Sequence, residues 1–520
     1  MSRLTKKRVL IANRGEIVLR VARTCNRLGY SPCGIYSEAD KDSLHIKSCQ
    51  EAISIGGFTP TESYLRVDKV IDAATKLGCE MIHPGYGFLA ENSSFAASCE
   101  RSGFTFIGPS SSTLELSGDK ARAREVASSI APVLPGKEVS NESEALGFAE
   151  KIGFPIIVKA VKGGGGRGLR TVYSAEELKQ AFASSRDEAL ISFGSGRVYI
   201  EKYLENPRHI EVQILGDSKT GENGGAINLG ERECSVQRRH QKLIEETPSA
   251  ALTPDNRAKL LETATAIAAK MKYDNAGTVE FLFKGGAFYF MELNSRIQVE
   301  HPITEMVTGV DIVEQQLRIA SGDGIAFKQG DVSFHGHAIE CRLNAEHPMT
   351  FAPFPGVVEK FVPPLSGTAS GDKSVRIDTA LYSGYSIPPY YDSLIAKLIC
   401  HAADRGQAIQ TMREALISTR ITGVPTTIPF HLSALNDSRF LQGNYDTSFV
   451  SDLKPYSVKS GEKAAALFAV LPRRLRKGSA ESAAAGTRPM HTADAWHGAA
   501  LFEAVTARSD SFGQKWRSDT

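Results

Sequence analysis

The sequence predicts an α/β fold that is divided among several domains. A buried strand over 8–12, an amphipathic helix over 15–28 and a second strand over 31–36 follow one another, which is the order of a βαβ unit. Alternation of strands and helices continues to about residue 108. The 520 residues are 42% hydrophobic, so the chain can bury sizeable cores, and at roughly 100–200 residues per domain its length suggests about three domains.

Composition and charge exclude several classes of protein. The 61 Lys and Arg residues nearly balance the 59 Asp and Glu residues, so no overall field favours nucleic acid or an anionic membrane. No stretch reaches the roughly 20 apolar residues that span a bilayer, and no signal peptide precedes the first strand. The eight scattered cysteines indicate neither a zinc site nor a disulfide framework. We therefore expect a cytoplasmic protein with reduced thiols.

Two loops of the first α/β segment are candidates for ligand binding. The turn over 13–16 before the first helix, which is expected to end at Gly29, lacks G-x-G-x-x-G. NAD binding is therefore disfavoured, although Glu38 and Asp40 follow the second strand. The glycine-punctuated segment 83–92 is expected at the carboxyl end of a strand, where ligands collect. A plain turn that needs glycine for its backbone angles is the alternative.

A run of glycines between two predicted strands indicates a nucleotide-binding lid. Gly163 to Gly168 lies between strands predicted over 156–158 and 169–173. Consecutive glycines can present backbone N–H groups to phosphate oxygens without steric obstruction. The run is not a Walker A loop, because G-x-x-x-x-G-K-[ST] is absent and no helix follows directly. The region 155–205 is therefore predicted to be a small lid domain, and a flexible connector is the alternative.

A predicted β-hairpin carries three side chains with oxygen ligands. If a three-residue loop joins its strands, Lys284 pairs with Phe288. Glu280 then lies opposite Glu292, and Asn294 shares their face. Opposed carboxylates repel one another unless a cation lies between them, and Mg²⁺ is usually bound by one or two carboxylates together with phosphate oxygens. Beside a phosphate-binding lid, this hairpin predicts an Mg-ATP site.

Further charged residues flank the hairpin in sequence. Arg296 can hold a small oxyanion bidentately, and Glu300 can act as a base near the proton of that anion. An Arg–Glu surface pair is the alternative. The polar residues of 209–213 alternate and so line one strand face. The cations of 234–242 are expected to bind a small anion or to be solvated, because aromatic residues typical of nucleic-acid binding are not interleaved with them.

The composition changes at about residue 454. The segment 454–520 is rich in Ala, Ser and Gly and carries 11 basic against 6 acidic residues. Both tryptophans of the chain, Trp496 and Trp516, lie in this segment, which is unusual for a purely disordered linker. The segment is predicted to be a linker with one or two short helices. A frayed terminus and a partner-docking helix near 493–506 are both compatible with this composition. Deletion of 455–520 is expected to weaken complex assembly and to leave the chemistry of the remaining chain intact.

Seven blocks of the sequence carry a family resemblance. They are Asn13 to Ile17, His83 to Phe88, Gly163 to Gly168, Glu201 to Leu204, Gln237 to Lys242, Glu292 to His301 and Glu340 to Arg342. Taken together, these blocks resemble the biotin carboxylases of the ATP-grasp superfamily, from about residue 6 to 450. The resemblance implies a Rossmann-like N-terminal domain over 1–118, an ATP-grasp domain over 119–330 with its lid at about 135–205, and a C-terminal biotin carboxylase domain over 331–453.

The resemblance also implies which residues bind ATP and metal. Lys120 and Lys159 would contact the phosphates, and Gly165 and Gly166 would cover them. The remaining ATP-binding residues would be Glu201, Lys202, Tyr203, Leu204, His209, Gln237 and His240. Mg²⁺ or Mn²⁺ would bind to Glu280, Glu292 and Asn294, as the hairpin already indicates.

For the chemistry, the resemblance implies carboxylation of biotin in two steps. Bicarbonate would bind to Lys242, Arg296, Gln298 and Val299, with Glu300 as the base that removes its proton. Attack on the γ-phosphate would form carboxyphosphate, which collapses to CO₂ and phosphate. Tyr86 and Gly87 would flank the biotin, and Arg342 would stabilise its anionic ureido oxygen. The catalytic residues would then be Arg296, Glu300, Arg342 and Lys242.

The resemblance also leads us to expect partner proteins. No Ala/Val-Met-Lys-Met motif of a biotinyl domain is present, and Ala269-Lys270-Met271 lies in a predicted helix. The biotin is therefore expected on a separate biotin carboxyl carrier protein, and carboxyl transfer on a separate carboxyltransferase subunit. The chain itself is expected to be a homodimer within an acyl-CoA carboxylase. The alternatives are a subunit of a pyruvate carboxylase, a different ATP-grasp carboxylate–amine ligase, and a catalytically silent nucleotide-binding scaffold.

Overall fold

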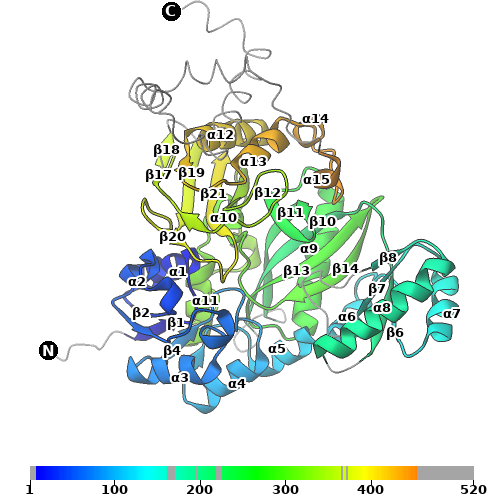
Figure 1. Ribbon diagram of the computed structural model, residues 1–520, viewed down its shortest axis with the longest axis horizontal. Helices are drawn as coiled ribbons and strands as arrows, with labels where there is room; N and C mark the ends of the chain where they lie inside the picture. The colour runs from blue at the N-terminus through cyan, green and yellow to red at the C-terminus, as the bar shows by residue number, and fades with distance from the viewer. Residues whose placement is uncertain are drawn as a thin grey trace, which may run out of the picture.

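The computed structural model describes residues 7–160, 170–193, 196–217, 225–364, 367–369 and 373–453. Within these ranges the fold is α/β, with one parallel sheet and several antiparallel sheets (Figure 1), which confirms the predicted fold class. The predicted phosphate loop with Gly165 and Gly166 lies outside the described residues. So does the segment 454–520 with its predicted docking helix.

The N-terminal part is a five-stranded parallel sheet with the order β3-β2-β1-β4-β5. Its first strand, helix and second strand lie within one residue of the predicted βαβ unit, and the strands are buried because helices cover the sheet. The strands are β1 Arg8–Ile11, β2 Ser31–Tyr36, β3 Glu51–Ser54, β4 Met81–His83 and β5 Thr105–Phe106. The helices are α1 Glu16–Arg27, α2 Leu44–Ser48, α3 Val67–Lys76 and α4 Ser93–Arg101.

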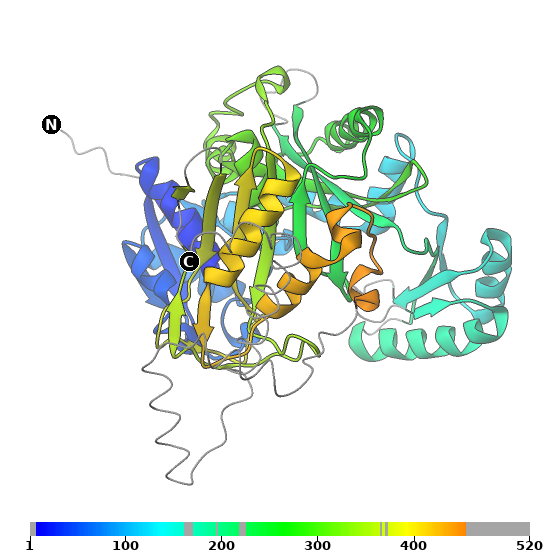
Figure 2. The same cartoon turned by 90° about the horizontal axis from the view of Figure 1, so that it is seen from above.

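A small four-stranded sheet with the order β6-β9-β7-β8 projects to one side of the molecule (Figures 1 and 2). Ile156 and Val158 alternate with more exposed neighbours, so one sheet face packs against helices α7 and α8. The elements are β6 Gly136–Val139, α7 Glu142–Ile152, β7 Ile156–Ala160, β8 Arg170–Val172, α8 Ala175–Phe193 and β9 Val198–Lys202. Helices α5 Ser111–Gly118 and α6 Lys120–Ser128 precede it.

A nine-stranded antiparallel sheet forms the body and continues from the central part of the chain into the C-terminal part. Its order is β14-β13-β10-β11-β12-β15-β21-β19-β18, so β12 pairs directly with β15. The strands are β10 Arg208–Gly216, β11 Ala226–Arg238, β12 Gln241–Thr247, β13 Asn275–Lys284, β14 Ala287–Asn294, β15 His337–Asn344, β18 Gly367–Ala369, β19 Lys373–Thr379 and β21 Leu394–Ala402.

Helices and two small ribbons complete this body. Helix α12 lies along β21 (Figure 2), and its buried residues share a core with that strand. The helices are α9 Pro254–Lys270, α10 His301–Thr308, α11 Ile312–Ser321, α12 Arg405–Ser418, α13 Ile428–Asn436, α14 Ser438–Leu441 and α15 Phe449–Asp452. The ribbons pair β16 Gly356–Val357 with β20 Ser386–Ile387, and β17 Lys360–Val362 with β22 Arg420–Thr422.

The β13–β14 hairpin differs from the prediction at its tip but not at its carboxylates. Lys284 pairs with Ala287, so the predicted pairing with Phe288 is wrong. The reason is that Gly285 and Gly286 both adopt positive φ and close a two-residue turn, whose twist suits a hairpin. A register shift next to Glu280 then restores the predicted pairing of Glu280 with Glu292.

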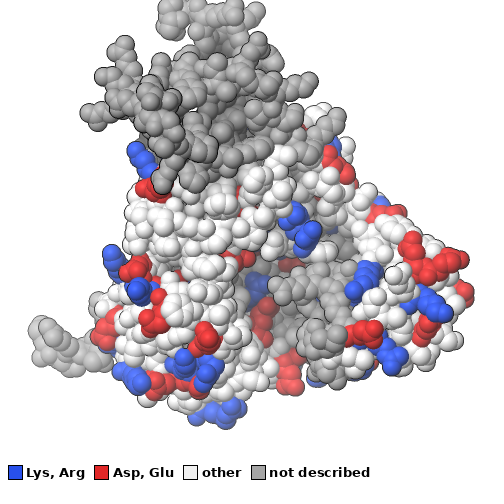
Figure 3. Space-filling view, viewed as in Figure 1, with Lys and Arg blue, Asp and Glu red and all other residues white. Residues whose placement is uncertain are grey.

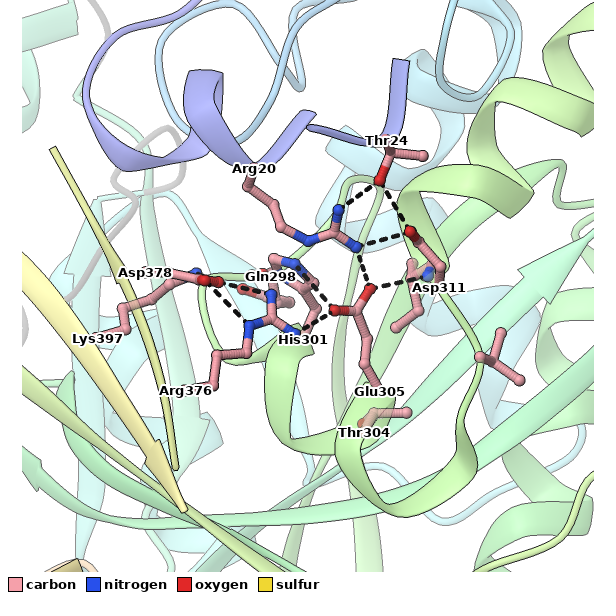
Figure 4. A network of polar contacts seen from close by, with 12 residues as sticks. Arg20, Thr24, Gln298, His301, Thr304, Glu305, Asp311, Arg376, Asp378 and Lys397 are labelled. Atoms are coloured by element: carbon pink, nitrogen blue, oxygen red, sulfur yellow. Dashed lines mark hydrogen bonds and ion pairs between the residues drawn. The ribbon is translucent and has the colours of Figure 1, made fainter. Parts of the chain in front are cut away.

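A buried network of charges joins the first helix to the body (Figure 4). Glu305 on α10 accepts from Arg20 on α1 at 2.5 Å and from Arg376 on β19 at 2.8 Å. Arg20 also donates to Asp311 at 2.7 Å, and Asp311 caps the first turn of α11. Glu305 therefore holds two guanidinium groups from segments that are far apart in sequence.

Glu305→Gln is expected to destabilise the protein by about 3 kcal/mol at neutral pH, because it leaves buried cations without a charge partner. Burial alone would raise the pKa of Glu305, but Arg20 and Arg376 hold it below its usual range. The ionised form therefore stabilises the fold above the unfolded pKa of about 4.3, and this stabilisation is lost as pH falls through the folded pKa. Chemical denaturation at pH 3 and at pH 8 measures the free energy of unfolding. We expect the difference between wild type and Glu305→Gln to be smaller at pH 3 than at pH 8. The exposed control Glu359→Gln should unfold like wild type, and an equal difference for Glu305→Gln at the two pH values would contradict the assignment.

Candidate active site

Lys242 is the centre of a buried cluster of carboxylates. It lies on β12, and its Nζ donates to Glu300 at 2.7 Å and to Glu280 at 2.9 Å. It also donates to Glu211 on β10. Although burial alone would lower the pKa of Lys242, these three carboxylates raise it well above its ordinary value. Lys242 is therefore a fixed cation between the β13–β14 hairpin and the start of α10.

Glu300 is held at both oxygens by cations. Lys242 donates to Oε1, and Arg342 on β15 donates to Oε2 at 2.8 Å. Arg342 also donates from Nε to Glu245 at 2.6 Å. Burial raises the pKa of Glu300, but Lys242 and Arg342 outweigh it and hold the pKa well below the usual range. Glu300 is therefore ionised at neutral pH and able to accept a proton.

The predicted metal ligands lie together on the hairpin. Glu280 faces Glu292 across the strands, and Asn294 lies two residues further along β14. Lys120 Nζ lies 3.1 Å from Glu292 Oε2, and His209 Nε2 lies 3.0 Å from Glu280 Oε2. Two opposed carboxylates and an amide form an all-oxygen donor set that fits Mg²⁺ or Mn²⁺. Binding of a metal ion by these three side chains stays a prediction.

The predicted ATP-binding residues on the lid are anchored by polar contacts. Glu201 on β9 accepts from Lys159 on β7 at 2.8 Å and from Arg124 on α6. Lys202 donates to the carbonyl groups of Gly153 and Phe154, both at 2.9 Å. Tyr203 and Leu204 follow β9 directly. These contacts connect the lid strands to the helix that precedes the lid.

Two further predicted ATP-binding residues, Gln237 and His240, lie at the β11–β12 turn. Gln237 pairs with Lys242 across the strands. Arg239 and His240 close the turn with φ of 48° and 66°. Neither is a glycine, so this backbone is strained. The turn places His240 beside the strand that carries Lys242.

Arg296 does not pair with Glu300, so the predicted alternative of an Arg296–Glu300 surface pair is wrong. Arg296 Nε lies 3.0 Å from Glu91 Oε2, and Nη1 donates to Gln298 Oε1 at 2.8 Å. Gln298 also donates to Glu280 at 3.4 Å. Gln298 therefore connects the predicted bicarbonate residues to the predicted metal ligands. The cations that contact Glu300 are Lys242 and Arg342.

The loop with the predicted biotin residues is hydrogen-bonded to the segment that follows β1. Asn13 donates through Nδ2 to the carbonyl groups of Pro84 at 2.7 Å and Tyr86 at 2.8 Å. Gly85 has φ of 64°, and a Cβ there would lie 2.8 Å from Asn13 Nδ2, so this glycine is required by a close approach. Tyr86 donates its hydroxyl to Glu16 on α1. Gly87 follows within the same loop.

Sequence reasoning missed four residues that contact the predicted catalytic side chains. Glu91 forms an ion pair with Arg296, Glu211 and Glu245 accept from Lys242 and Arg342, and Arg232 on β11 donates to Glu211. Glu211 was visible as one of the alternating polar residues of 209–213, and Glu91 lay within the glycine-punctuated loop. Glu245 and Arg232 carried no local signal, because their roles arise from strand pairing.

Arg232 is fully buried and links four side chains. It donates to Gln213 at 2.8 Å, Thr304 at 3.0 Å and Thr278 at 3.1 Å, in addition to Glu211. Arg232→Leu is expected to lower the free energy of unfolding by about 3–5 kcal/mol, because it leaves a buried carboxylate without its main partner. Denaturant unfolding measures this loss. The double variant Arg232→Leu/Glu211→Leu should recover part of it, and a single-variant loss under about 1 kcal/mol would contradict the assignment.

The fold and the site define a ligase that uses ATP: a small sheet that projects from the body, a hairpin with two opposed carboxylates, and a buried glutamate between two cations. Three family models match the chain. They are "Biotin carboxylase, N-terminal domain" over 5–114, "Carbamoyl-phosphate synthase L chain, ATP binding domain" over 119–327, and "Biotin carboxylase C-terminal domain" over 340–452.

Similar proteins and structures agree with this. The chain is 48% identical over 451 residues to a pyruvate carboxylase subunit of Methanothermobacter thermautotrophicus, covering 86% of this chain and 90% of the relative. It is 47% identical to biotin carboxylase 1 of Bacillus subtilis, covering 85% of this chain and 98% of the relative. A biotin carboxylase structure from Campylobacter jejuni has a TM-score of 0.81 at 45% identity, covering 86% of this chain and 98% of the other.

A further neighbour is the biotin carboxylase domain dimer of the Hydrogenobacter thermophilus 2-oxoglutarate carboxylase in complex with MgADP, ADP and bicarbonate. It has a TM-score of 0.82 at 45% identity and covers 87% of this chain and 99% of the other. The chain therefore belongs to the biotin carboxylase family. It is an enzyme, and the reaction of its family is the ATP- and bicarbonate-dependent carboxylation of biotin. Among the residues described, no helix combines the length and apolar character needed to cross a membrane.

Proposed function

We propose that this chain carboxylates biotin carried on a separate carrier protein, as the first half-reaction of an acyl-CoA carboxylase. One observation carries this proposal. Glu280, Lys242, Glu300 and Arg342 form an unbroken series of contacts, each at 2.9 Å or less, from the metal-ligand hairpin to the predicted biotin subsite. Phosphate activation and carboxyl transfer need such adjacent sites, because a short-lived intermediate must pass between them.

At the ATP end, Lys120 and Lys159 supply positive charge to the phosphates. Glu280, Glu292 and Asn294 would hold Mg²⁺, which neutralises phosphate charge when it is bound. The lid residues Glu201 to Leu204, with His209, Gln237 and His240, form the nucleotide side of the site. Their separation onto β9, β10 and the β11–β12 turn supports a nucleotide held between lid and body.

At the bicarbonate end, Arg296, Gln298, Val299 and Lys242 bind the anion and Glu300 accepts its proton. Lys242 and Arg296 offset the repulsion between bicarbonate and the phosphates, and they orient the nucleophile for in-line attack. Arg342 stabilises the negative charge on the ureido oxygen of biotin. Tyr86 and Gly87 would border this subsite, in a loop whose position is fixed by the hydrogen bond from Asn13 to the carbonyl group of Tyr86.

The test is phosphate release from Mg-ATP by the purified chain, with and without bicarbonate and free biotin. We expect turnover that requires bicarbonate and rises with biotin. Turnover indifferent to both would contradict the proposal and favour a different ATP-grasp carboxylate–amine ligase. Binding of nucleotide without any turnover would instead indicate a silent scaffold.

The same proposal includes two partners, a biotin carrier protein and a carboxyltransferase subunit, together with a homodimeric state and a cytoplasmic location. The relative named for pyruvate carboxylase supports a place in a multisubunit carboxylase, and the domain dimer of the Hydrogenobacter neighbour supports the homodimer. Figure 3 shows basic and acidic side chains interspersed over the described part of one face. Transfer of label from bicarbonate to a biotinylated carrier protein, but not to its unbiotinylated form, tests the carrier role.

A further inference from the structure

A fully buried glutamate, Glu340, lies beside Arg342 and has no part in the proposed reaction. The two residues are two positions apart on β15 and so share one face of the sheet. Strand register places Glu245 of β12 directly opposite Glu340, and Lys397 of β21 directly opposite Arg342. Four ionisable side chains of three neighbouring strands therefore share one buried face.

The cations next to Glu340 are engaged elsewhere. Arg342 donates to two other carboxylates. Lys397 is fully buried, donates to the carbonyl group of Val299 at 3.0 Å, and lies 3.1 Å from Glu16. Within the described part of the chain, neither carboxylate oxygen of Glu340 has a hydrogen-bond partner. An ionised carboxylate in such a place would be both desolvated and without a partner.

Among the described residues, no cation around this face forms an ion pair with Glu340. Arg342 pairs with Glu245 and Glu300, Lys397 pairs with Glu16, and Lys242 pairs with Glu300. A buried carboxylate that lacks both a hydrogen bond and its own cation takes up a proton instead. Burial, reinforced by Glu245 and Glu300, raises the pKa of Glu340 well above its usual range against the opposing cations.

We propose that Glu340 is a positioning residue of the biotin subsite, and that it must stay a neutral carboxylic acid for Arg342 to stabilise the anionic ureido oxygen. This rests on the proposed function. Arg342 already faces Glu245 and Glu300. A third negative charge two residues along the same strand would cancel its remaining positive field and repel the developing anion. A neutral Glu340 leaves that field available to the substrate.

The groups that face Glu340 come from several elements, and the test must separate it from them. They are Glu245 on β12, Arg342 on β15, Lys397 on β21, Glu300 at the start of α10 and Tyr86 from the loop after β4. Glu16 on α1 reaches this set through Tyr86 and Lys397. Glu340→Gln keeps the size and neutrality of the protonated acid and removes only its ability to ionise, so it isolates this one titration.

The first experiment is infrared difference spectroscopy of the full chain, comparing wild type with Glu340→Gln at pH 7 and above. We expect a protonated carboxyl band in wild type that is absent from the variant and that titrates away at alkaline pH. In parallel, biotin-stimulated phosphate release should fall about tenfold in wild type at one pH unit above that titration, in proportion to the protonated fraction. In Glu340→Gln, biotin-stimulated phosphate release should not decrease over this pH range. In the control Glu346→Gln, which neutralises another largely buried glutamate near β15, the release should decrease as in wild type.

Two results would overturn the proposal. Absence of the protonated carboxyl band at pH 7 would show that Glu340 is ionised. An alkaline fall in Glu340→Gln equal to that of wild type would show that its titration does not control Arg342. If phosphate release by wild type did not depend on biotin, the proposed function itself would be contradicted. The infrared band reports the protonation state of Glu340 whether or not biotin stimulates turnover.

Discussion

Replacing Glu300 by glutamine is expected to lower bicarbonate-dependent phosphate release by about 10²–10⁴-fold, the usual contribution of a positioned base. Glutamine keeps the shape of the side chain but cannot accept a proton. The measurement is kcat at saturating Mg-ATP and bicarbonate. The structural reason for a large effect is that Glu300 is the carboxylate that both Lys242 and Arg342 contact, so no neighbouring acid can take its place.

The control for this variant is the exposed Glu359→Gln, which should retain wild-type turnover. Nucleotide binding should be retained in Glu300→Gln, because Glu300 is separated from the predicted metal ligand Glu280 by Lys242. If Glu300→Gln kept more than about one tenth of wild-type kcat, Glu300 would not be the base. If it lost nucleotide binding as well, its role would be structural.

Arg342→Lys is expected to lower biotin-stimulated turnover by about 10²–10³-fold, which is typical for removal of one electrostatic donor in an active site. Arginine reaches Glu245 through Nε and Glu300 through Nη2. Lysine has a single ammonium group and cannot reproduce this fork. The charge is kept, so the loss reports geometry rather than net charge.

This prediction is tested by comparing the effect of Arg342→Lys on phosphate release with and without biotin. Because Arg342 is assigned to the biotin end, bicarbonate-dependent release in the absence of biotin should fall by a much smaller factor than the biotin-stimulated rate. Equal losses in both assays would place Arg342 in the phosphate step and contradict its assignment. The conservative control Arg413→Lys lies on α12, where the side chain contacts the carbonyl group of Leu435, and should keep both rates.

The sequence by itself determined the fold class, the βαβ start and the presence of the hairpin that carries Glu280 and Glu292. These features follow from the periodicity of apolar residues and from turn-forming residues, and both signals depend only on residues that are close in sequence. The position of the hairpin turn could not be settled in this way. A two-residue glycine turn and a register shift compensate one another, and only the pairing of whole strands distinguishes that arrangement from a three-residue loop.

The tertiary structure alone decided how the charges are shared. Glu245 meets Arg342 because β12 pairs with β15, and Glu91 meets Arg296 because a loop of the N-terminal sheet reaches the body. The neutral state inferred for Glu340 likewise depends on burial and on neighbours from other strands. A side chain's charge partners are set by proximity in space, which the order of residues along the chain does not encode locally, so these assignments required the folded molecule.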